Sequence, residues 1–445
     1  MKQKPTLSLS RVAMLCFFLT GSLNAWAFQA GTHAPRNTFK ASVVKIDITP
    51  DNPQVLLGYN PRTSTGVHDR IYHKIVVLDD GISRFFLVSS DICEFSPAEY
   101  DKVAARLKKE MGIARENFWW TVTHTHSAPE FGPAGLAEVF LGDRYEHKYD
   151  EGYYNLIVEK LVEGIKEAND KLVPARLGVG WGYSQANINR RGRDIDGTTR
   201  LGLNPDGPVD RRIGLIRIDK EDGSPLALIA NYAIHGTVLG GASTVISGDA
   251  PGIAAEYVEQ KTGAPLLFIN GAAGDLAPIY SVYPSPGAGH LMEFRVLLGD
   301  KILEANKKIT TAKEVTLKVG KVTVETPRKE GLGWLPELKK YTKTTKAGEE
   351  MVLLPVGFLK INDDIAIWNA PLELFCEVSN EIRDQSPFPY TFYFGYSNGW
   401  LGYLPSESEW QYGGYETSVS PYTPSAAGDL SEAVLSYLKG ELMKD

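Results

Sequence analysis

The sequence predicts an α/β protein, a single large domain in which mixed β-sheets are flanked by helices. Apolar or alternating segments of strand length recur along the chain, and amphipathic segments of helix length lie between them. No internal repeat or long low-complexity linker divides the 445 residues. Because length alone is a soft guide to domain number, the lack of a divider favours one domain.

The elements follow from local patterns taken in chain order. Strands are predicted at 42–48, 74–78, 85–89, 117–122, 176–181, 212–218, 226–234, 265–269, 315–325, 351–368 (a hairpin) and 392–396. Helices are predicted at 97–111, 151–169, 252–261, 291–308, 372–383 and 429–443. Turn residues at Asp79-Asp80-Gly81 and Asn362-Asp363-Asp364 predict two hairpins. Asp429 or Ser431 is expected to cap the closing helix.

Two segments are predicted to be surface loops that shape access to a site. Residues 191–211 are rich in Gly, Arg and Asp, and residues 280–289 contain prolines and glycines. Irregular segments of this kind are where substrate specificity is often determined.

The first 27 residues are predicted to be a secretory signal peptide. Lys2 and Lys4 supply positive charge, Val12 to Leu19 form an apolar core, and Ala25-Trp26-Ala27 fits a small-residue cleavage site. Cleavage there would leave 28–445 as the mature domain, in the periplasm or outside the cell. A retained N-terminal anchor is the alternative, for which the apolar stretch is short.

Charge and cysteine content restrict the partners and the chemistry. The net charge of -7 argues against a nucleic-acid partner, but it is compatible with contact at a membrane surface. Beyond the signal peptide only Cys93 and Cys376 remain, which excludes a disulfide framework and a cysteine-based zinc site. Two buried free thiols are expected, and nothing in the sequence indicates an obligate protein partner.

His124 and His126, within Thr123-His124-Thr125-His126-Ser127, are the first candidates for chemistry. Their spacing at the end of a predicted strand points both imidazoles to one face, where both can bind metal, or one metal and the other substrate. The small hydroxyl residues around them are expected to orient the rings. Such a pair also occurs by chance, as ordinary polar residues near a strand end.

His235 and Glu373 add two further candidate ligands at predicted strand or helix ends. A catalytic zinc needs about three nitrogen or oxygen ligands and an open position. Each residue also has an ordinary explanation, since His235 can be a satisfied core histidine and Glu373 can benefit from a helix N-terminus. Asp275, after a glycine-rich segment, can orient a metal-bound histidine or a water, although a tight strand-to-loop turn alone also explains the segment.

Several common catalytic signatures are missing from the sequence. It has no HExxH helix of metalloproteases, no G-x-S-x-G nucleophile elbow and no Walker loop. Tyr403 and Tyr415 lie in an aromatic, glycine-rich stretch, where tyrosines usually pack.

Together these motifs resemble the neutral, or non-lysosomal, ceramidase family. The matching segments occur in the family's order: Thr123 to Pro129, Asn187 to Arg190, Ala233 to His235, Gly274 to Pro278, Pro371 to Glu373, and Ser397-Asn398 running on to Tyr403 and Tyr415. The resemblance implies that family's catalytic-domain fold. It also implies a zinc-dependent hydrolase that cleaves an N-acyl amide linkage, with a ceramide-type lipid as the first candidate substrate.

The resemblance further implies roles for individual residues. It implies a Zn²⁺ ion held by His124, His235, Glu373 and Tyr403. It implies that His126 lies beside the metal, that Arg190 binds substrate near the scissile amide, and that Tyr415 stabilises the oxyanion. Water activated by zinc would attack the carbonyl, and His126 or another nearby group would pass a proton to the leaving amine.

The chain departs from the family pattern at three points. Ala277 replaces the serine of Gly-Asp-x-Ser-Pro, which excludes a covalent serine there and favours attack by zinc-bound water. Arg191-Gly192-Arg193 replaces the usual Ser-Pro after the Asn-Arg motif, so the substrate pocket is expected to differ. The chain is also expected to lack the C-terminal β-sandwich of longer members.

Two other functions stay open at this point. One is a zinc hydrolase that acts on an amide or ester of a glycan or small molecule. The other is a non-catalytic binding protein with the same fold, because fold alone never establishes function.

Overall fold

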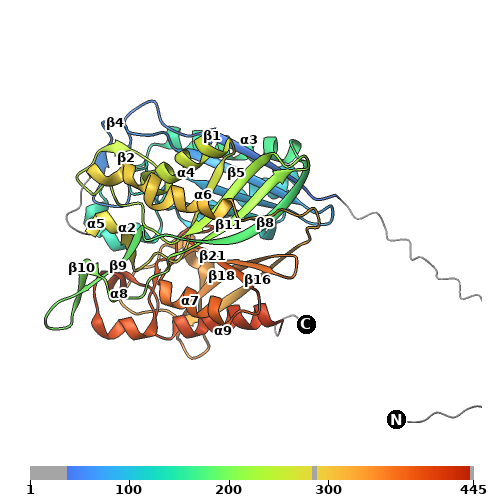
Figure 1. The fold of residues 1–445 in the computed structure, drawn as a ribbon. Helices are drawn as coiled ribbons and strands as arrows, with labels where there is room; N and C mark the ends of the chain where they lie inside the picture. The colour runs from blue at the N-terminus through green and yellow to red at the C-terminus, as the bar shows by residue number, and fades with distance from the viewer. Residues whose placement is uncertain (1–37, 283–287, 441–445) are drawn as a thin grey trace, which may run out of the picture. The chain divides into compact units, whose positions relative to one another are not determined.

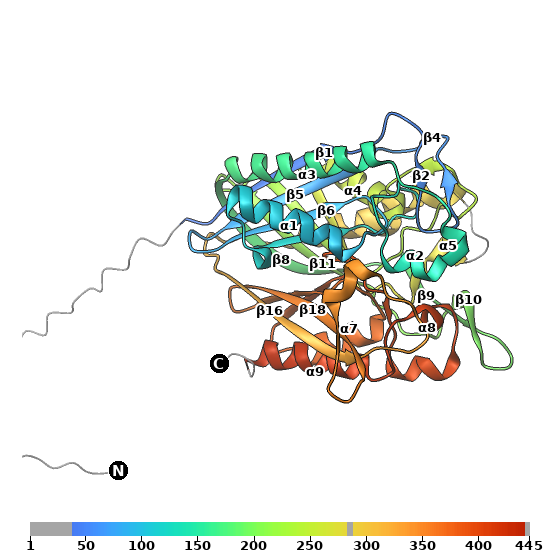
Figure 2. The same ribbon diagram turned by 180° about the vertical axis from the view of Figure 1, so that it is seen from behind.

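Two β-sheets lie face to face, and helices cover the outer face of each (Figures 1 and 2). The structure is a computed structural model that describes residues 38–282 and 288–440. The described residues belong to one compact unit. This arrangement confirms the predicted α/β class with mixed sheets. The predicted signal peptide, 1–27, and part of the predicted loop 280–289 lie outside the described residues.

The larger sheet has eight strands in the order β14-β12-β11-β8-β1-β5-β6-β7. Its strands are β1 (Lys40–Asp47), β5 (Tyr72–Asp79), β6 (Arg84–Ser90), β7 (Phe118–Val122), β8 (Val173–Tyr183), β11 (Arg212–Lys220), β12 (Pro225–Tyr232) and β14 (Leu266–Asn270). Neighbours are antiparallel, except for the parallel pairs β6–β7 and β12–β14. The carboxyl ends of strands in each parallel pair meet at one edge, and the loops that follow them carry the site described below.

Helices α1 (Pro97–Met111), α3 (Glu151–Asp170), α4 (Asp249–Thr262) and α6 (Lys301–Asn306) cover the outer face of this sheet (Figures 1 and 2). Helix α1 shows why local prediction succeeds here. The Ser96 hydroxyl accepts from the Ala98 amide, Pro97 begins the helix, and Gly112 ends it with φ of 71°. These three residues together fix both ends of the helix.

The smaller sheet consists of β16 (Leu317–Pro327), β18 (Glu350–Ile361), β19 (Ile365–Asn369) and β21 (Tyr390–Phe394), with β17 (Thr342–Thr344) beside β18. Helices α7 (Cys376–Gln385) and α9 (Ala426–Lys439) cover its outer face (Figure 1). Buried side chains of both sheets, such as Leu87 and Ile216 from the larger and Leu359 and Ile367 from the smaller, form one shared apolar cluster. That cluster is the core between the sheets.

Short elements connect the sheets and surround the site. The strand pieces are β2 (Val55–Leu56) with β3 (Arg62–Thr63), β4 (Gly66–Val67) with β13 (Val245–Ile246), β9 (Asn187–Arg193) with β10 (Thr199–Asn204) and β15 (Leu276–Pro278), and β20 (Glu373–Leu374) with β22 (Tyr403–Leu404). The short α-helices are α2 (Leu136–Leu141), α5 (Ile279–Val282) and α8 (Tyr415–Val419). The 3-10 helices are Arg115–Asn117, Gly142–Tyr145, Ala288–Glu293, Pro336–Tyr341 and Glu407–Tyr412.

Three predicted helices differ from the structure, one by being divided and two in where they begin. Segment 291–308 is divided into the end of a 3-10 helix, a π-helical segment at Arg295–Asp300 and α6. The segment predicted as helix from 372 becomes helical only at Cys376, because Glu373 and Leu374 pair with β22 instead. The closing helix begins at Ala426, so Asp429 lies inside its first turn, where the carboxylate accepts from Thr326 and does not cap the helix.

The predicted surface loop 191–211 is also wrong in part. Its first half belongs to an antiparallel ribbon of β9 and β10, which extends outward beside α8 (Figures 1 and 2). Both cysteines are free and buried, as predicted. Within the part of the chain that the structure describes, no helix is both long and apolar enough to cross a membrane.

Candidate metal centre and active site

His124 lies just beyond the end of β7, in a left-handed backbone conformation with φ of 57°. The expectation that a strand would point His124 and His126 to one face is therefore wrong, because the chain has left the strand. The two rings meet all the same. Their Nε2 atoms are 3.1 Å apart and their centroids 4.8 Å apart, with the planes almost perpendicular.

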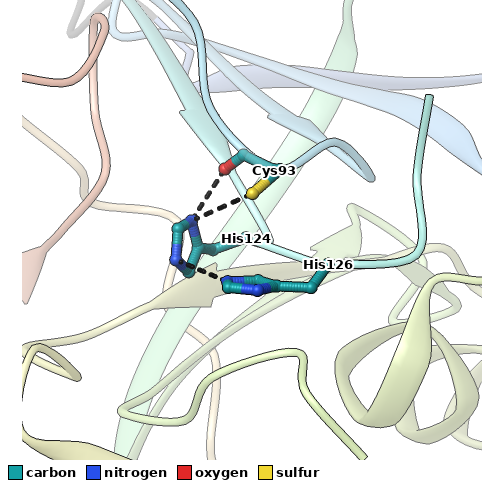
Figure 3. Close-up of side chains that lie close together, drawn as sticks. All are labelled: Cys93, His124 and His126. Carbon is teal, nitrogen blue, oxygen red and sulfur yellow. Dashed lines mark hydrogen bonds between the residues drawn. The ribbon is translucent and has the colours of Figure 1, made fainter. Parts of the chain in front are cut away.

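The main chain of a neighbouring loop orients the His124 ring. Nδ1 of His124 donates to the carbonyl oxygen of Cys93 at 2.8 Å, and the Cys93 thiol lies 3.9 Å from the same nitrogen (Figure 3). The hydroxyl groups expected to orient the rings make no hydrogen bond to either ring. Thr125 donates to the carbonyl of Ser247, and the Thr123 hydroxyl has no hydrogen-bond partner among the described residues. The prediction of orienting hydroxyls is wrong.

His235 is positioned in the same way from the other parallel pair. It follows β12 by three residues, and its Nδ1 donates to the carbonyl oxygen of Leu276 at 2.8 Å. Asp275 was expected to orient a ligand, but its carboxylate accepts from the Cys376 amide and from Asn189. Burial raises the pKa of Asp275 to about 7. The orienting group is thus the carbonyl one residue further along.

Glu373 is held by aromatic side chains and not by a helix N-terminus. It lies in β20, directly opposite Tyr403 of β22. Its Oε1 accepts from Nε1 of Trp400 at 3.0 Å, and its Oε2 accepts from the Tyr396 hydroxyl at 3.3 Å. Sequence reasoning missed both donors, because it assigned the aromatic, glycine-rich stretch to packing.

His124, His235 and Glu373 form one buried cluster. Oε2 of Glu373 lies 3.5 Å from Nε2 of His124 and 3.0 Å from Nε2 of His235. Burial lowers the pKa of both histidines, that of His235 to about 3. Burial opposes ionisation of Glu373, but positive charge on His124, His235 and Arg190 outweighs it and lowers the pKa of Glu373 to about 2. Glu373 is therefore ionised, and burial favours the neutral form of the two imidazoles once another positive charge, Arg190 or a metal ion, faces the carboxylate.

These protonation states fit a divalent metal. Because each Nδ1–H donates to a carbonyl, Nε2 of each neutral ring carries a lone pair that faces the carboxylate. Three electron-pair donors that face one another are stabilised by a positive charge beside them, which Arg190 supplies here and which a bound cation would supply more directly. Two neutral imidazoles and one carboxylate are ligands typical of a catalytic zinc site. His124 also belongs to a second possible group with Cys93 and His126 (Figure 3).

Arg190 reaches the cluster from β9. Its Nη1 donates to Nε2 of His235 at 3.0 Å, its Nη2 donates to the Tyr403 hydroxyl at 3.1 Å, and its Nε donates to Glu416 at 2.9 Å. A metal held by His235 would take the place of the first of these bonds. Burial disfavours the charged guanidinium, but Tyr403, Glu416 and Glu373 outweigh it and raise the pKa of Arg190.

The unusual Arg191-Gly192-Arg193 sequence now has a structural explanation. Glu416 is 0% exposed and accepts from Arg190 and, at 2.6 Å, from Arg191. Arg191 is 1% exposed, and both it and Arg193 donate to Glu409. The two extra arginines therefore tie β9 to the segment that carries Tyr415.

A cavity opens beside the cluster, and most of the predicted site residues line it. Those on its wall are His124, His126, Glu373, Tyr403 and Tyr415. The rings of Tyr403 and Tyr415 lie 5.7 Å apart. His235 and Arg190 are not among its lining residues, but they contact residues that are. The predicted residues thus come together in space, some on the cavity wall and two, His235 and Arg190, behind it.

His126 is packed closely against Gly58 on the cavity wall. A Cβ atom added at Gly58, where φ is 100°, would lie 2.5 Å from Cγ of His126. Burial, followed by the neighbouring histidines His124 and His235, lowers the pKa of His126 well below its usual value. Ala277 is buried in β15 opposite Ile188, and it is absent from the residues that line the cavity.

Comparisons with known proteins identify the relatives of this chain. The family model described as "Neutral/alkaline non-lysosomal ceramidase, N-terminal" matches residues 39–271. A neutral ceramidase of Pseudomonas aeruginosa is 29% identical over 297 residues, which are 63% of this chain and 42% of that protein. Neutral ceramidase B of Dictyostelium discoideum is 29% identical over 228 residues, 49% of this chain and 31% of that one. The match thus spans less than half the length of these relatives.

Solved structures show the same fold. One described as "Ceramidase complexed with C2" superposes with a TM-score of 0.72 at 21% identity, over 91% of this chain and 76% of the other. The crystal structure of neutral ceramidase from Pseudomonas aeruginosa gives 0.71 at 22% identity, over 91% and 75%. With the family model covering more than half of its residues, this chain belongs to the neutral/alkaline non-lysosomal ceramidase family.

Proposed function

We propose that the protein is an exported zinc-dependent amidohydrolase that cleaves an N-acyl linkage, with a ceramide-type lipid as its first candidate substrate. One observation carries the proposal. Two imidazoles and a carboxylate converge in a chain of this family, and two of the three side chains, those of His124 and Glu373, line a cavity. Export follows from the predicted signal peptide, and a lipid substrate would bring the enzyme to a membrane surface.

His124, His235, Glu373 and Tyr403 are the proposed metal ligands. Zinc bound there would lower the pKa of a water and polarise a carbonyl. Burial and the neighbouring Glu373 raise the pKa of Tyr403, so the phenol is neutral without the metal. Its pairing with Glu373 across β20 and β22 supports a shared ligand role.

Three other side chains are proposed to handle the substrate. Tyr415 lines the cavity with 43% of its surface exposed, and its phenol, which is protonated at neutral pH, can donate to the carbonyl oxygen. His126 faces the cluster and is proposed to take up the proton that the attacking water releases and to pass this proton to the leaving amine. Arg190 is proposed to hold Tyr403 and to bind the substrate near the scissile amide.

Fatty-acid release from ceramide by zinc-replete protein tests the proposal. We expect turnover that a chelator abolishes and added zinc restores. His124→Ala and Glu373→Ala should lose activity, and the exposed His290→Ala should retain it. Full activity in the first two variants would overturn the assigned site.

A second candidate keeps the metal and changes the substrate. Glu94 and Arg144 give the cavity wall two polar, ionisable side chains, which favours an amide or ester on a polar small molecule or glycan. Hydrolysis of N-acetyl or acyl-ester sugars without release of fatty acid from ceramide would select this candidate.

A further inference from the structure

One carboxylate on the cavity wall has no role in the proposed metal centre. Glu94 lies in the loop between β6 and α1, and it follows Cys93, whose carbonyl orients His124. It lines the same cavity as His124, His126 and Tyr415, and it is only 8% exposed.

Glu94 lacks the donors that every comparable carboxylate has. Across residues 38–282 and 288–440, its carboxylate makes no hydrogen bond and no ion pair. The other buried carboxylates in this part of the chain each accept from a protein donor: Asp79, Asp80, Asp91, Glu99, Glu130, Asp219, Asp249, Asp275, Glu373 and Glu416. Buried polar groups are rarely left unpaired, and an unpaired one on a cavity wall indicates a missing ligand group.

The charges around Glu94 define what that group must be. Besides burial, Glu373 and Glu130 raise the pKa of Glu94, and both are acidic. Arg144 lines the cavity but makes no ion pair with Glu94. A positively charged or hydroxyl donor would stabilise the ionised form of Glu94 against this burial and these acidic neighbours, whereas an anion would be repelled.

The other residues that line the cavity indicate that the donor to Glu94 belongs to the amine half of the substrate. Leu57, Ala137, Phe140, Leu141 and Val419 offer apolar surface suited to an acyl chain, which carries no donor. We propose that Glu94 is a specificity-determining residue that accepts a hydrogen bond from a hydroxyl or ammonium group on the amine half of the substrate. This inference rests on the proposed amidase function. A site built to bond such a group discriminates strongly against an analogue that lacks it.

Three matched amides test this assignment on the zinc-loaded protein. N-octanoyl ethanolamine, N-octanoyl ethylenediamine and N-octanoyl propylamine place a hydroxyl, an ammonium or a methyl group at the same position. We expect kcat/KM for the hydroxyl or the ammonium amide to exceed that for the methyl amide by at least about 10-fold in the unaltered protein. Glu94→Met should reduce this preference to within about 2-fold. Glu94→Gln should keep a preference for the hydroxyl amide and lose one for the ammonium amide.

Controls separate this inference from folding and from the proposed function. Thermal melting and zinc content verify that each variant is folded and loaded, and Glu407→Met removes an exposed carboxylate elsewhere and should keep the preference. If no amide is hydrolysed, the proposed function fails. The role of Glu94 is then tested by calorimetry, as the ratio of the dissociation constants of the methyl amide and the hydroxyl or ammonium amide. No preference in the unaltered protein, or an equal preference in Glu94→Met, would overturn the role of Glu94.

Discussion

The two sides of the proposed metal centre are built by different means. On the side of the larger sheet, His124 and His235 follow strands of two parallel pairs, and each ring is oriented by a main-chain carbonyl. On the side of the C-terminal segments, Glu373 is held by the side chains of Trp400 and Tyr396. The histidine side therefore depends on backbone geometry, and the glutamate side depends on the identity of single residues.

The difference predicts where substitutions matter. A carbonyl acceptor survives replacement of its own side chain, whereas a side-chain donor is lost with its residue. Groups that orient metal ligands affect affinity even though they do not touch the metal. Conservative changes should therefore weaken metal binding on the glutamate side and leave it nearly unchanged on the histidine side.

The largest effect is expected where a ligand itself is removed. His235→Ala and Glu373→Gln should each lower zinc affinity by more than the roughly 100-fold that loss of an orienting partner causes. Competition with a chromophoric chelator measures this, with His290→Ala as the control. Equal affinity in Glu373→Gln and the unaltered protein would remove the glutamate side from the metal centre.

The ion pairs that join β9 to the C-terminal segments should have the next largest effect, on the free energy of unfolding. Glu416 pairs with Arg190 and Arg191, so Glu416→Gln would leave the buried guanidinium of Arg190 without its ion-pair partner and that of Arg191 with Glu409 alone. We expect the free energy of unfolding to fall by about 3–5 kcal/mol, measured by urea denaturation. Glu409→Gln, at a partly exposed pair, should cost less. A smaller loss for Glu416→Gln than for Glu409→Gln would contradict this account.

A conservative change on the glutamate side should have a moderate effect. Trp400→Phe removes the indole donor to Oε1 of Glu373 and keeps an aromatic ring. Zinc affinity should fall by about 10- to 100-fold, as for other groups that orient ligands. Chelator competition on the folded variant measures it, and unchanged affinity would mean that Glu373 is held by its remaining contacts.

The matching change on the histidine side should have the smallest effect. Cys93→Ala removes the thiol near His124 but keeps the carbonyl that binds Nδ1. Zinc affinity should stay within about 3-fold of the unaltered protein, because the orienting bond is retained. A loss as large as that of Trp400→Phe would show that the thiol itself holds the metal.

Prediction of the fold from sequence succeeded where the signals were local. Helix 97–111 coincides with α1 because its cap, proline and terminal glycine are adjacent to it. The hairpin at Asp79-Asp80-Gly81 follows from its turn residues. The helix predicted from 372 failed because a distant segment, β22, pairs with Glu373 and Leu374, and no local pattern reports such pairing.

The site was predictable in its titratable residues and not in their supports. His124, His235 and Glu373 stand out by residue type and by position near element ends. The carbonyls of Cys93 and Leu276 leave no trace in the sequence, because every residue has a carbonyl. From the sequence, Trp400 is expected to be a packing residue, because it is a large aromatic residue in an aromatic stretch. Only its hydrogen bond to Glu373 shows that it orients a proposed ligand.

Anomalous diffraction at the zinc edge from crystals of the zinc-loaded protein tests the central claim most directly. The account predicts one strong peak bonded to Nε2 of His124, Nε2 of His235, a carboxylate oxygen of Glu373 and the phenol oxygen of Tyr403, at roughly 2.0–2.2 Å. A peak bonded instead to the thiol of Cys93 and to His126, the other possible group around His124, would contradict it.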